Sequence, residues 1–399
     1  MHNDTLLNSA RELLPDVIEL RRTLHRHPEV GNDLPVTRET VLAALDGSPL
    51  ELHLHSSTSG IVAVLEGELP GPAIVLRGDM DALPMPEDTG LPYASEVHGA
   101  MHACGHDLHT AMLVGAARLL CARRDQLPGR VVFMFQPGEE GNHGAQIMLD
   151  EGLLEVVDPA PTGAFAVHVT SRYEAGTIHH RPGPLMASAD ELDVIITGRG
   201  GHASAPFLAQ DPIPVAAEIV LAVETALTRR INVLDPAVVT FARMAAGTTH
   251  NVIPETAELS GTIRALSEET RAQVHEMIER VATNVAAAHG VEAHVRIRPG
   301  YPVTINDDTF SHLVTDVALD LVGEKNVIPM PFPIMGAEDW SYVLQKVPGA
   351  MVFLGACPTD LVPGDAPNNH SNRVRFDEDA MATGVALYAA VAMAHLEAS

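Results

Sequence analysis

Short apolar runs that end in acidic residues or histidine recur along the first half of the chain. The runs are Ala73–Leu76, Val131–Phe135 and Ala164–Val167. Each is followed directly by side chains that can bind a cation or move a proton: Asp79 and Asp81, Glu139 and Glu140, and His168. Such runs predict buried strands, and helical periodicity between them predicts connecting helices. We therefore expect an α/β fold with a mainly parallel sheet, helices on both faces, and a polar site along its carboxyl edge.

The pattern changes after Ala189, where strands and helices alternate in the order βαββαβ. The expected elements are Glu191–Thr197, Pro212–Thr228, Ala237–Met244, Ala257–Ala265, Glu268–His289 and Glu292–Arg298. This order is typical of a ferredoxin-like α+β domain. The α/β pattern resumes around Asp307. We therefore expect a main domain formed by residues 1–187 and 302–399, interrupted by an inserted domain at 188–301.

Composition limits the kinds of partner and location. The chain carries 52 acidic and 25 basic residues, a formal charge of -27, and only 4% aromatic residues. Such a surface repels nucleic acid and anionic lipid. No apolar run of 18 or more residues and no secretory signal are apparent, and three cysteines do not suggest a disulfide framework. We expect a cytoplasmic protein that binds neither nucleic acid nor membranes.

The sequence His-Ala-Cys-Gly-His-Asp-Leu-His at 102–109 concentrates potential metal ligands. Taken alone, it could also be a polar loop at the start of a helix. With residues from elsewhere in the chain it supplies a thiolate, a carboxylate and three imidazoles, from Cys104, Glu140, His106, His168 and His370. Five ligands are more than the four of a closed structural zinc site. They suit two divalent ions that share a ligand or a water. Zinc is expected, and manganese, cobalt and nickel are compatible with these ligands.

The residues beside these ligands suggest a hydrolytic reaction. Glu139 is the expected general base, which would take a proton from a metal-bound water and deliver it to the leaving nitrogen of an amide. His202, in a glycine-rich segment of the inserted domain, would donate a hydrogen bond to the oxyanion. Asp81 and Asp107 are candidates to orient ligand imidazoles. Taken singly, His202 and His370 are each more typical of an ordinary loop than of a catalytic site.

Short motifs run in order along nearly the whole chain: RTLHRHPE at 22–29, RGDMDALP at 77–84, HACGHDLH at 102–109, QPGEEG at 136–141, GRGGHAS at 198–204, GTTHNVIP at 247–254, GTIR at 261–264 and GAED at 336–339. Jointly they resemble the aminoacylase and carboxypeptidase-like di-metal hydrolases, metallopeptidase family twenty. The resemblance is to the branch of hippurate hydrolases, auxin-conjugate (IAA-amino acid) hydrolases and bacterial N-acyl-L-amino acid amidohydrolases.

The resemblance implies a zinc-exopeptidase-like catalytic domain with two divalent metals, and a smaller lid domain through which two copies form a homodimer. It implies the ligand, base and oxyanion roles given above, and it places Asn251 and Arg264 near the carboxylate of the substrate. Relatives outside this branch carry a histidine at the position of Asp79. The role of Asp79 is therefore left open, and Asp81 is expected to support the ligands.

The expected reaction is hydrolysis of an N-acyl-L-amino acid, or a related amino-acid conjugate, to a carboxylic acid and a free amino acid. A dipeptidase or exopeptidase on the same scaffold is the alternative, and comparing an acyl-amino acid with a dipeptide as substrates would separate the two. A metal-binding or storage protein without turnover is a further alternative, but such a protein would have no use for Glu139 as a base.

Overall fold

The computed structural model describes residues 2–398 and divides into two compact units. The first unit comprises Met1–Gly183, Ile305–Phe332 and Asp339–Ser399, and the second comprises Pro184–Thr304 and Pro333–Glu338. The domain limits expected from the sequence lie a few residues from these positions. The segment Pro333–Glu338 lies outside the expected insert.

The first unit is built on an eight-stranded sheet in the order β1-β2-β4-β3-β5-β16-β6-β15. Its strands are β1 (Glu51–Leu54), β2 (Ile61–Glu66), β3 (Leu69–Asp79), β4 (Pro128–Gln136), β5 (Gly163–Glu174), β6 (Ile178–His180), β15 (Val327–Pro329) and β16 (Gly349–Cys357). The central strands β4, β3, β5 and β16 pair in parallel, whereas β1, β2 and β6 join the sheet through antiparallel pairs. The predicted α/β fold with a mainly parallel central sheet is therefore confirmed.

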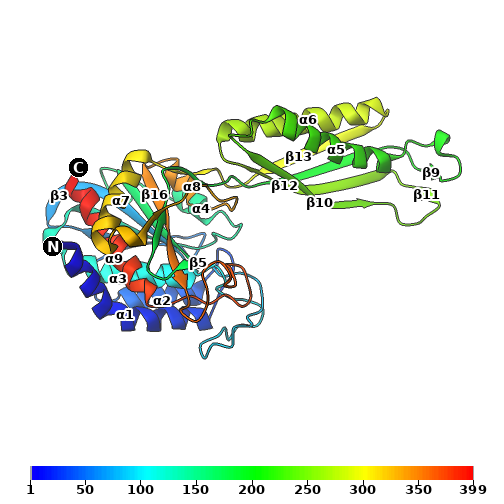
Figure 1. Ribbon diagram of the computed structural model, residues 1–399. Coiled ribbons are helices and arrows are strands. Elements are labelled where there is room, and N and C mark those ends of the chain that lie inside the picture. The colour runs from blue at the N-terminus through cyan, green and yellow to red at the C-terminus, as the bar shows by residue number, and fades with distance from the viewer. Residues whose placement is uncertain (1, 399) are drawn as a thin grey trace. The chain divides into compact units, whose positions relative to one another are not determined.

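Helices cover the faces of this sheet (Figure 1). They are α1 (His2–Arg26), α2 (Pro35–Leu45), α3 (His106–Cys121), α4 (Gly144–Asp150), α7 (Asp308–Val322), α8 (Ser341–Leu344) and α9 (Ala380–Ala398). By length and composition alone α9 could cross a membrane, but 89% of its apolar stretch is buried inside the unit. Because α1, α3 and α7 pack around it, α9 is apolar on all sides.

Two strands of the first unit run further than the sequence pattern indicated. β5 was expected to end at His168, but it continues to Glu174 because its polar second half still pairs with β16, up to Cys357. Residues 69–72, which precede the apolar run Ala73–Leu76 and include two prolines, extend β3 toward its start. An irregular register between Leu69 and Ala73 accommodates the prolines that could not donate to a regular ladder.

The second unit has a four-stranded antiparallel sheet in the order β10-β12-β8-β13. Its main elements are β8 (Asp190–Thr197), α5 (Pro212–Arg230), β10 (Ala237–Ala246), β12 (Thr256–Ala265), α6 (Glu268–Ala288) and β13 (Glu292–Pro299). α5 and α6 pack together on the sheet around a core that includes Val194, Ile219 and Ile278. The predicted ferredoxin-like order is therefore present, with each boundary within two residues of the prediction.

The second unit has a base and a tip. At the base, where the chain enters and leaves, Asp190 of β8 pairs with Ile263 and Pro299. At the other end, Thr197 leads into β9 (Gly201–His202), which pairs with β11 (Val252–Ile253). Figure 1 shows β9 and β11 beyond the end of the four-stranded sheet, and we call this end the tip.

Candidate metal centre and active site

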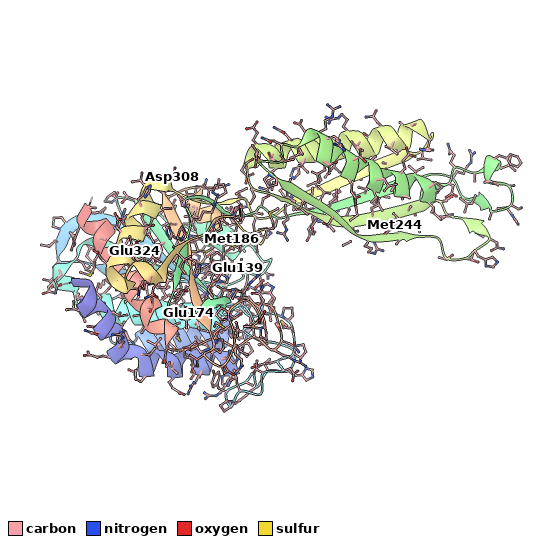
Figure 2. All side chains as sticks on the ribbon, in the orientation of Figure 1. Glu139, Glu174, Met186, Met244, Asp308 and Glu324 are labelled. Atoms are coloured by element: carbon pink, nitrogen blue, oxygen red, sulfur yellow. The ribbon has the colours of Figure 1, made fainter. Side chains whose placement is uncertain are left out.

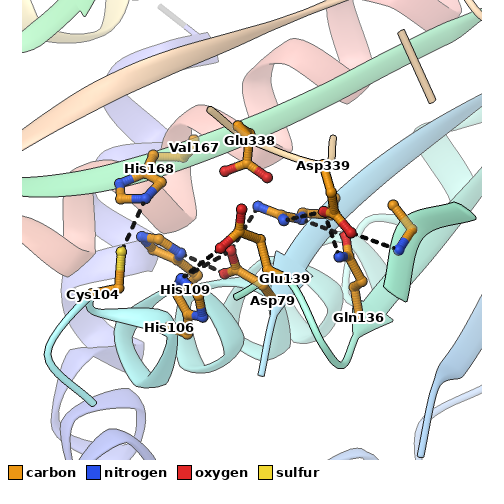
Figure 3. A network of polar contacts seen from close by, with 12 residues as sticks. Asp79, Cys104, His106, His109, Gln136, Glu139, Val167, His168, Glu338 and Asp339 are labelled. Atoms are coloured by element: carbon orange, nitrogen blue, oxygen red, sulfur yellow. Dashed lines mark hydrogen bonds and ion pairs between the residues drawn. The ribbon is translucent and has the colours of Figure 1, made fainter. Parts of the chain in front are cut away.

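The five predicted metal ligands come together in the first unit, and Figure 3 shows three of them, Cys104, His106 and His168. Donor atoms of Cys104, His106 and His168 lie within 4.8 Å of one another, and Cys104 Sγ is 3.5 Å from His168 Nε2. Donor atoms of Cys104, Glu140 and His370 meet the same limit, with His370 Nε2 3.1 Å from Glu140 Oε1. Cys104 belongs to both groups. The ligands therefore form two neighbouring trios that share one sulfur atom.

Local backbone conformation positions the loop that carries Cys104 and the turn that carries His370. Gly105 has a φ of +92°, and a Cβ there would collide with Val169. Glycine therefore lets the chain turn sharply between Cys104 and the start of α3. His370 also has a positive φ, 68°, which is uncommon for a residue with a side chain. The hydrogen bond from His370 N to Ala103 O, 2.9 Å long, ties this turn to the cysteine loop.

Hydrogen bonds fix which nitrogen of each buried histidine can bind a cation. Nδ1 of His106 donates to the carbonyl of Asp81, and Nδ1 of His168 donates to the carbonyl of Val169, both over 2.8 Å. Because a carbonyl only accepts, the proton sits on Nδ1 and Nε2 keeps its lone pair for a metal. His109 differs: its Nε2 accepts from Val169 N and its Nδ1 donates to Asp79. Both of its nitrogens are occupied, which excludes it as a ligand.

The donor set fits two divalent cations. His106 Nε2 is buried and has no hydrogen-bond partner among residues 2–398. Hydrogen bonds from His370 to Cys104 and Glu140 raise the pKa of His370 to about 10, so the local field favours a positive charge. Burial raises the pKa of the Cys104 thiol. A divalent cation would supply the positive charge and would draw the thiol into its thiolate form, which is the form that binds metals.

Asp81 supports the site through three backbone groups. Its carboxylate accepts from the amides of Glu139 and Glu140, over 2.9 and 3.0 Å, and its own carbonyl holds His106. Asp81 is buried, and its carboxylate is not among the grouped donor atoms. This geometry suits a residue that orients the two glutamates. Glu139 Oε2 lies 3.9 Å from His106 Nε2, and donor atoms of His106, Glu139 and Glu140 lie within 4.8 Å of one another.

Asp79, whose role the sequence left open, is part of a buried network. Its carboxylate lies 2.7 Å from Arg77 Nη1 and 2.6 Å from His109 Nδ1. Burial would raise the pKa of Asp79, but Arg77, His106 and His109 together hold it well below its usual range. A permanently charged carboxylate can hold both partners. Sequence reasoning missed Arg77 and His109 in these roles, although both lie inside motifs that it singled out.

Asp107 does not orient a ligand imidazole, contrary to the prediction. Its Oδ2 lies 2.7 Å from Arg21 Nε and 2.8 Å from His25 Nδ1, and both partners are on α1. Helical geometry explains the difference, because consecutive residues at the start of α3 point in different directions. Asp107 therefore ties the ligand helix to the N-terminal helix.

The remaining predicted residues belong to the second unit and lie at its two ends. His202 and Asn251 line a cavity of about 450 Å³ at the tip. His202 Nδ1 accepts from Ser204 N over 3.1 Å, which leaves the Nε2 proton as a donor. Arg264 lies at the base, where it pairs with Val238 in the sheet. One copy of the unit therefore brings His202 and Asn251 together but not Arg264.

Comparison with known proteins identifies the family and similar enzymes. Residues 75–394 match the model described as "Peptidase family M20/M25/M40". An N-acetylcysteine deacetylase of Bacillus subtilis is 38% identical over 96% of this chain and 97% of its own length. IAA-amino acid hydrolase ILR1-like 4 of Arabidopsis thaliana is 35% identical, covering 95% and 86%. Thermostable carboxypeptidase 1 of Saccharolobus solfataricus is 34% identical, covering 98% of each chain.

A solved structure agrees with both the fold and the donor set. The Bacillus subtilis YXEP protein, described as a dinuclear metal binding peptidase, superimposes with a TM-score of 0.83 at 34% identity. The match covers 97% of this chain and 99% of that one. Together with the two trios of donor atoms, it supports two divalent metal ions per chain.

Proposed function

The chain belongs to the peptidase family M20/M25/M40 and is a metal-dependent amide hydrolase; on this premise we propose that it cleaves N-acyl-L-amino acids, or related amino-acid conjugates, to a carboxylic acid and a free amino acid. The similarity to an N-acetylcysteine deacetylase and to an IAA-amino acid hydrolase supports this substrate class. Both names describe an acyl group joined to an amino acid.

One observation carries the proposal: two donor trios share Cys104, and a second glutamate lies directly at their side. Glu140 belongs to a trio with His370, while the neighbouring Glu139 approaches His106. Asp81 holds the amides of both glutamates. Metal storage would require the ligands alone, whereas hydrolysis also requires a base of this kind.

The residues present divide the chemistry among them. Divalent cations held by the two trios would supply Lewis acidity toward the amide carbonyl and the attacking water. Glu139 takes one proton from that water while the water oxygen bonds to the carbonyl carbon. Glu139 then gives the proton to the amide nitrogen as the carbon–nitrogen bond breaks. The Nε2–H of His202 donates to the oxyanion. Asn251 and Arg264 bind the carboxylate of the amino-acid product.

Zinc is the proposed metal, because one thiolate and three imidazoles suit it well. Manganese, cobalt and nickel are the alternatives that the same ligands accept. Metal analysis by mass spectrometry of protein purified without added metal, followed by reconstitution of the stripped protein with each ion, distinguishes them. A location in the cytoplasm, where the three free cysteines stay reduced, belongs to the same proposal.

A homodimer through the second unit is part of the proposal. β10 is an edge strand with exposed apolar side chains, among them Val238 and Met244. Figure 2 labels Met244 on this strand. Such an edge can pair with a second copy. Arg264 lies near one end of β12, and His202 lies on β9, beyond the other end, so most of the strand, about 30 Å at the usual rise per residue, separates them. Two copies would supply both to one substrate. Sedimentation equilibrium measures the oligomeric state directly.

The deciding experiment is a substrate panel on metal-loaded enzyme. Release of free amino acid is measured for N-acetylcysteine, other N-acyl amino acids, an indole-acetyl amino acid and a set of dipeptides. We expect acyl-amino acids to be cleaved with the higher kcat/KM. A preference for dipeptides would favour the peptidase alternative, which the carboxypeptidase relative represents. No cleavage of any member would overturn the proposal.

A further inference from the structure

The loop that carries Glu139 and Glu140 leaves β4 at Gln136, enters α4 at Gly144 and closes on itself at a narrow neck. Gly144 N donates to Gly138 O over 3.1 Å, and a Cβ at Gly144 would collide with the carbonyl of Pro137. The two sides of the neck are therefore in close contact. Any change in the neck alters where both glutamates lie.

The carboxylate of Asp339 holds both sides of this neck (Figure 3). Its Oδ1 accepts from Gln136 Nε2 over 2.7 Å, and its Oδ2 accepts from Ala145 N over 2.9 Å. Asp339 is fully buried, so its charge needs a local counter-ion. Arg77 supplies one, with Nη2 at 3.3 Å from Oδ1.

The same arginine connects the loop to the ligand helix. Arg77 Nε donates to Gln136 Oε1 over 2.9 Å, and Arg77 Nη1 lies 2.7 Å from Asp79. Asp79 in turn binds His109 of α3 and lies 3.3 Å from His106 Nε2. One buried guanidinium is thus shared by the glutamate loop and the helix that begins with His106.

We propose that Asp339 is a positioning residue, which fixes the neck of the loop and so sets where Glu139 and Glu140 lie relative to Cys104. Only a carboxylate serves here, because three N–H groups point at its two oxygens. An asparagine would turn its own NH₂ toward one of these donors and would leave Arg77 with less compensation. The role assigned to Glu139 rests on the proposed function, whereas the role at Glu140 concerns metal binding alone.

The test compares Asp339→Asn with Glu151→Gln in the full-length protein. Glu151 is a matched control at the other end of α4, where its carboxylate also accepts from three N–H groups, those of His55, Ser56 and Ser57. Metal-free protein is titrated with Zn²⁺ against a chelating indicator, and kcat and KM are measured on the best substrate of the panel. Thermal unfolding is followed by circular dichroism.

For Asp339→Asn we expect one Zn²⁺ to bind about 10–100-fold more weakly, the other to bind as in wild type, and kcat to fall about 10–100-fold at unchanged KM. Glu151→Gln should change none of these values. Wild-type zinc affinities in Asp339→Asn, an equal weakening of both sites, or the same losses in Glu151→Gln would overturn the proposal.

A second variant covers the case in which Asp339→Asn does not fold. Gln136→Met keeps the length of the side chain but removes its hydrogen bonds to Asp339 and Arg77, and it should weaken the same single zinc site. Unaltered zinc binding in Gln136→Met would count against the proposal. If the wild-type enzyme hydrolyses no amide, the proposed function fails, and the zinc titration still decides the role of Asp339 at Glu140.

Discussion

The two units hold their functional residues in different ways. In the first unit, Cys104 and His106 lie in a buried setting fixed by Asp79, Asp81 and the carbonyl groups around them. At the tip of the second unit, His202 is exposed, and its Nδ1 hydrogen-bonds to the backbone N–H and the hydroxyl of Ser204, two residues away. Binding two cations requires several donors held at fixed positions, and only long-range buried contacts provide that rigidity.

This contrast predicts different consequences of mutation in the two units. Substitutions in the first unit should change stability, metal content and activity together. The exception is a residue that takes part in the reaction but holds no metal ion or other residue in position. Changes at the tip should affect activity alone.

Glu139→Gln should have the largest effect on turnover. General base catalysis typically contributes about 10²–10⁴-fold, so kcat should fall by that factor while two metal ions stay bound. Glu140→Gln is the matched variant, because it removes a ligand at the neighbouring position and should lower metal content as well. Mass spectrometry of the metal and steady-state kinetics on the same samples separate the two. Loss of metal in Glu139→Gln would show that Glu139 is a ligand.

Asp79→Ala should be the most destabilising change. It leaves Arg77 and His109 buried without their shared carboxylate, and breaking a buried ion pair in this way typically costs about 3–5 kcal/mol. Urea unfolding of the metal-free protein measures the cost without a contribution from bound ions. A change below about 1 kcal/mol would show that the network is not needed for folding of the first unit.

His202→Ala should lower kcat about 10²–10³-fold, which is the usual effect of removing an oxyanion donor. Because His202 is exposed, the unfolding temperature should stay at the wild-type value. His294→Ala is the control, since His294 is also exposed in the second unit but belongs to β13 of the sheet. Wild-type turnover in His202→Ala, or an equal loss of turnover in both variants, would show that the tip has no catalytic role.

The chain order of the elements could be predicted because it follows from local patterns. The strands and helices of the second unit, and β4, α3 and the central parallel sheet of the first, are visible as apolar periodicity. The extension of β5 past His168 could not be predicted, because polar residues there are held by pairing with β16. Such pairing joins segments that are far apart in the sequence and leaves no local signal.

The same reasoning applies to the site. Residues with chemically distinctive side chains, such as Cys104 and Glu140, could be proposed as ligands from their type and motif. The partners that orient them could not, because their roles depend on which segments meet. Asp107 illustrates this, since its type suited a partner of a ligand histidine but its direction on α3 takes it to Arg21. Asp339 belongs to the motif GAED, which by itself indicates no role, and only its contacts with Gln136, Ala145 and Arg77 give it one.

A substitution at Asp190 tests whether the second unit has a buried network of its own that is separate from its tip. At the base of that unit, its carboxylate binds Arg271 and His275 Nε2. Although burial opposes the charge, hydrogen bonds from His275 and Arg271 lower the pKa of Asp190 to about 2.

A carboxylate with a lowered pKa stabilises the fold above its unfolded-state pKa of about 3.9, and the contribution disappears as the pH falls through the folded-state value. At pH 7, Asp190→Asn should therefore cost about 1–2 kcal/mol after allowance for solvent screening. The difference from wild type should shrink as the pH falls from 4 to about 2. Denaturant unfolding at several pH values measures it, and a difference that does not change with pH would mean that the ion pair is not its source. Metal content should not change, because the metal ligands belong to the first unit.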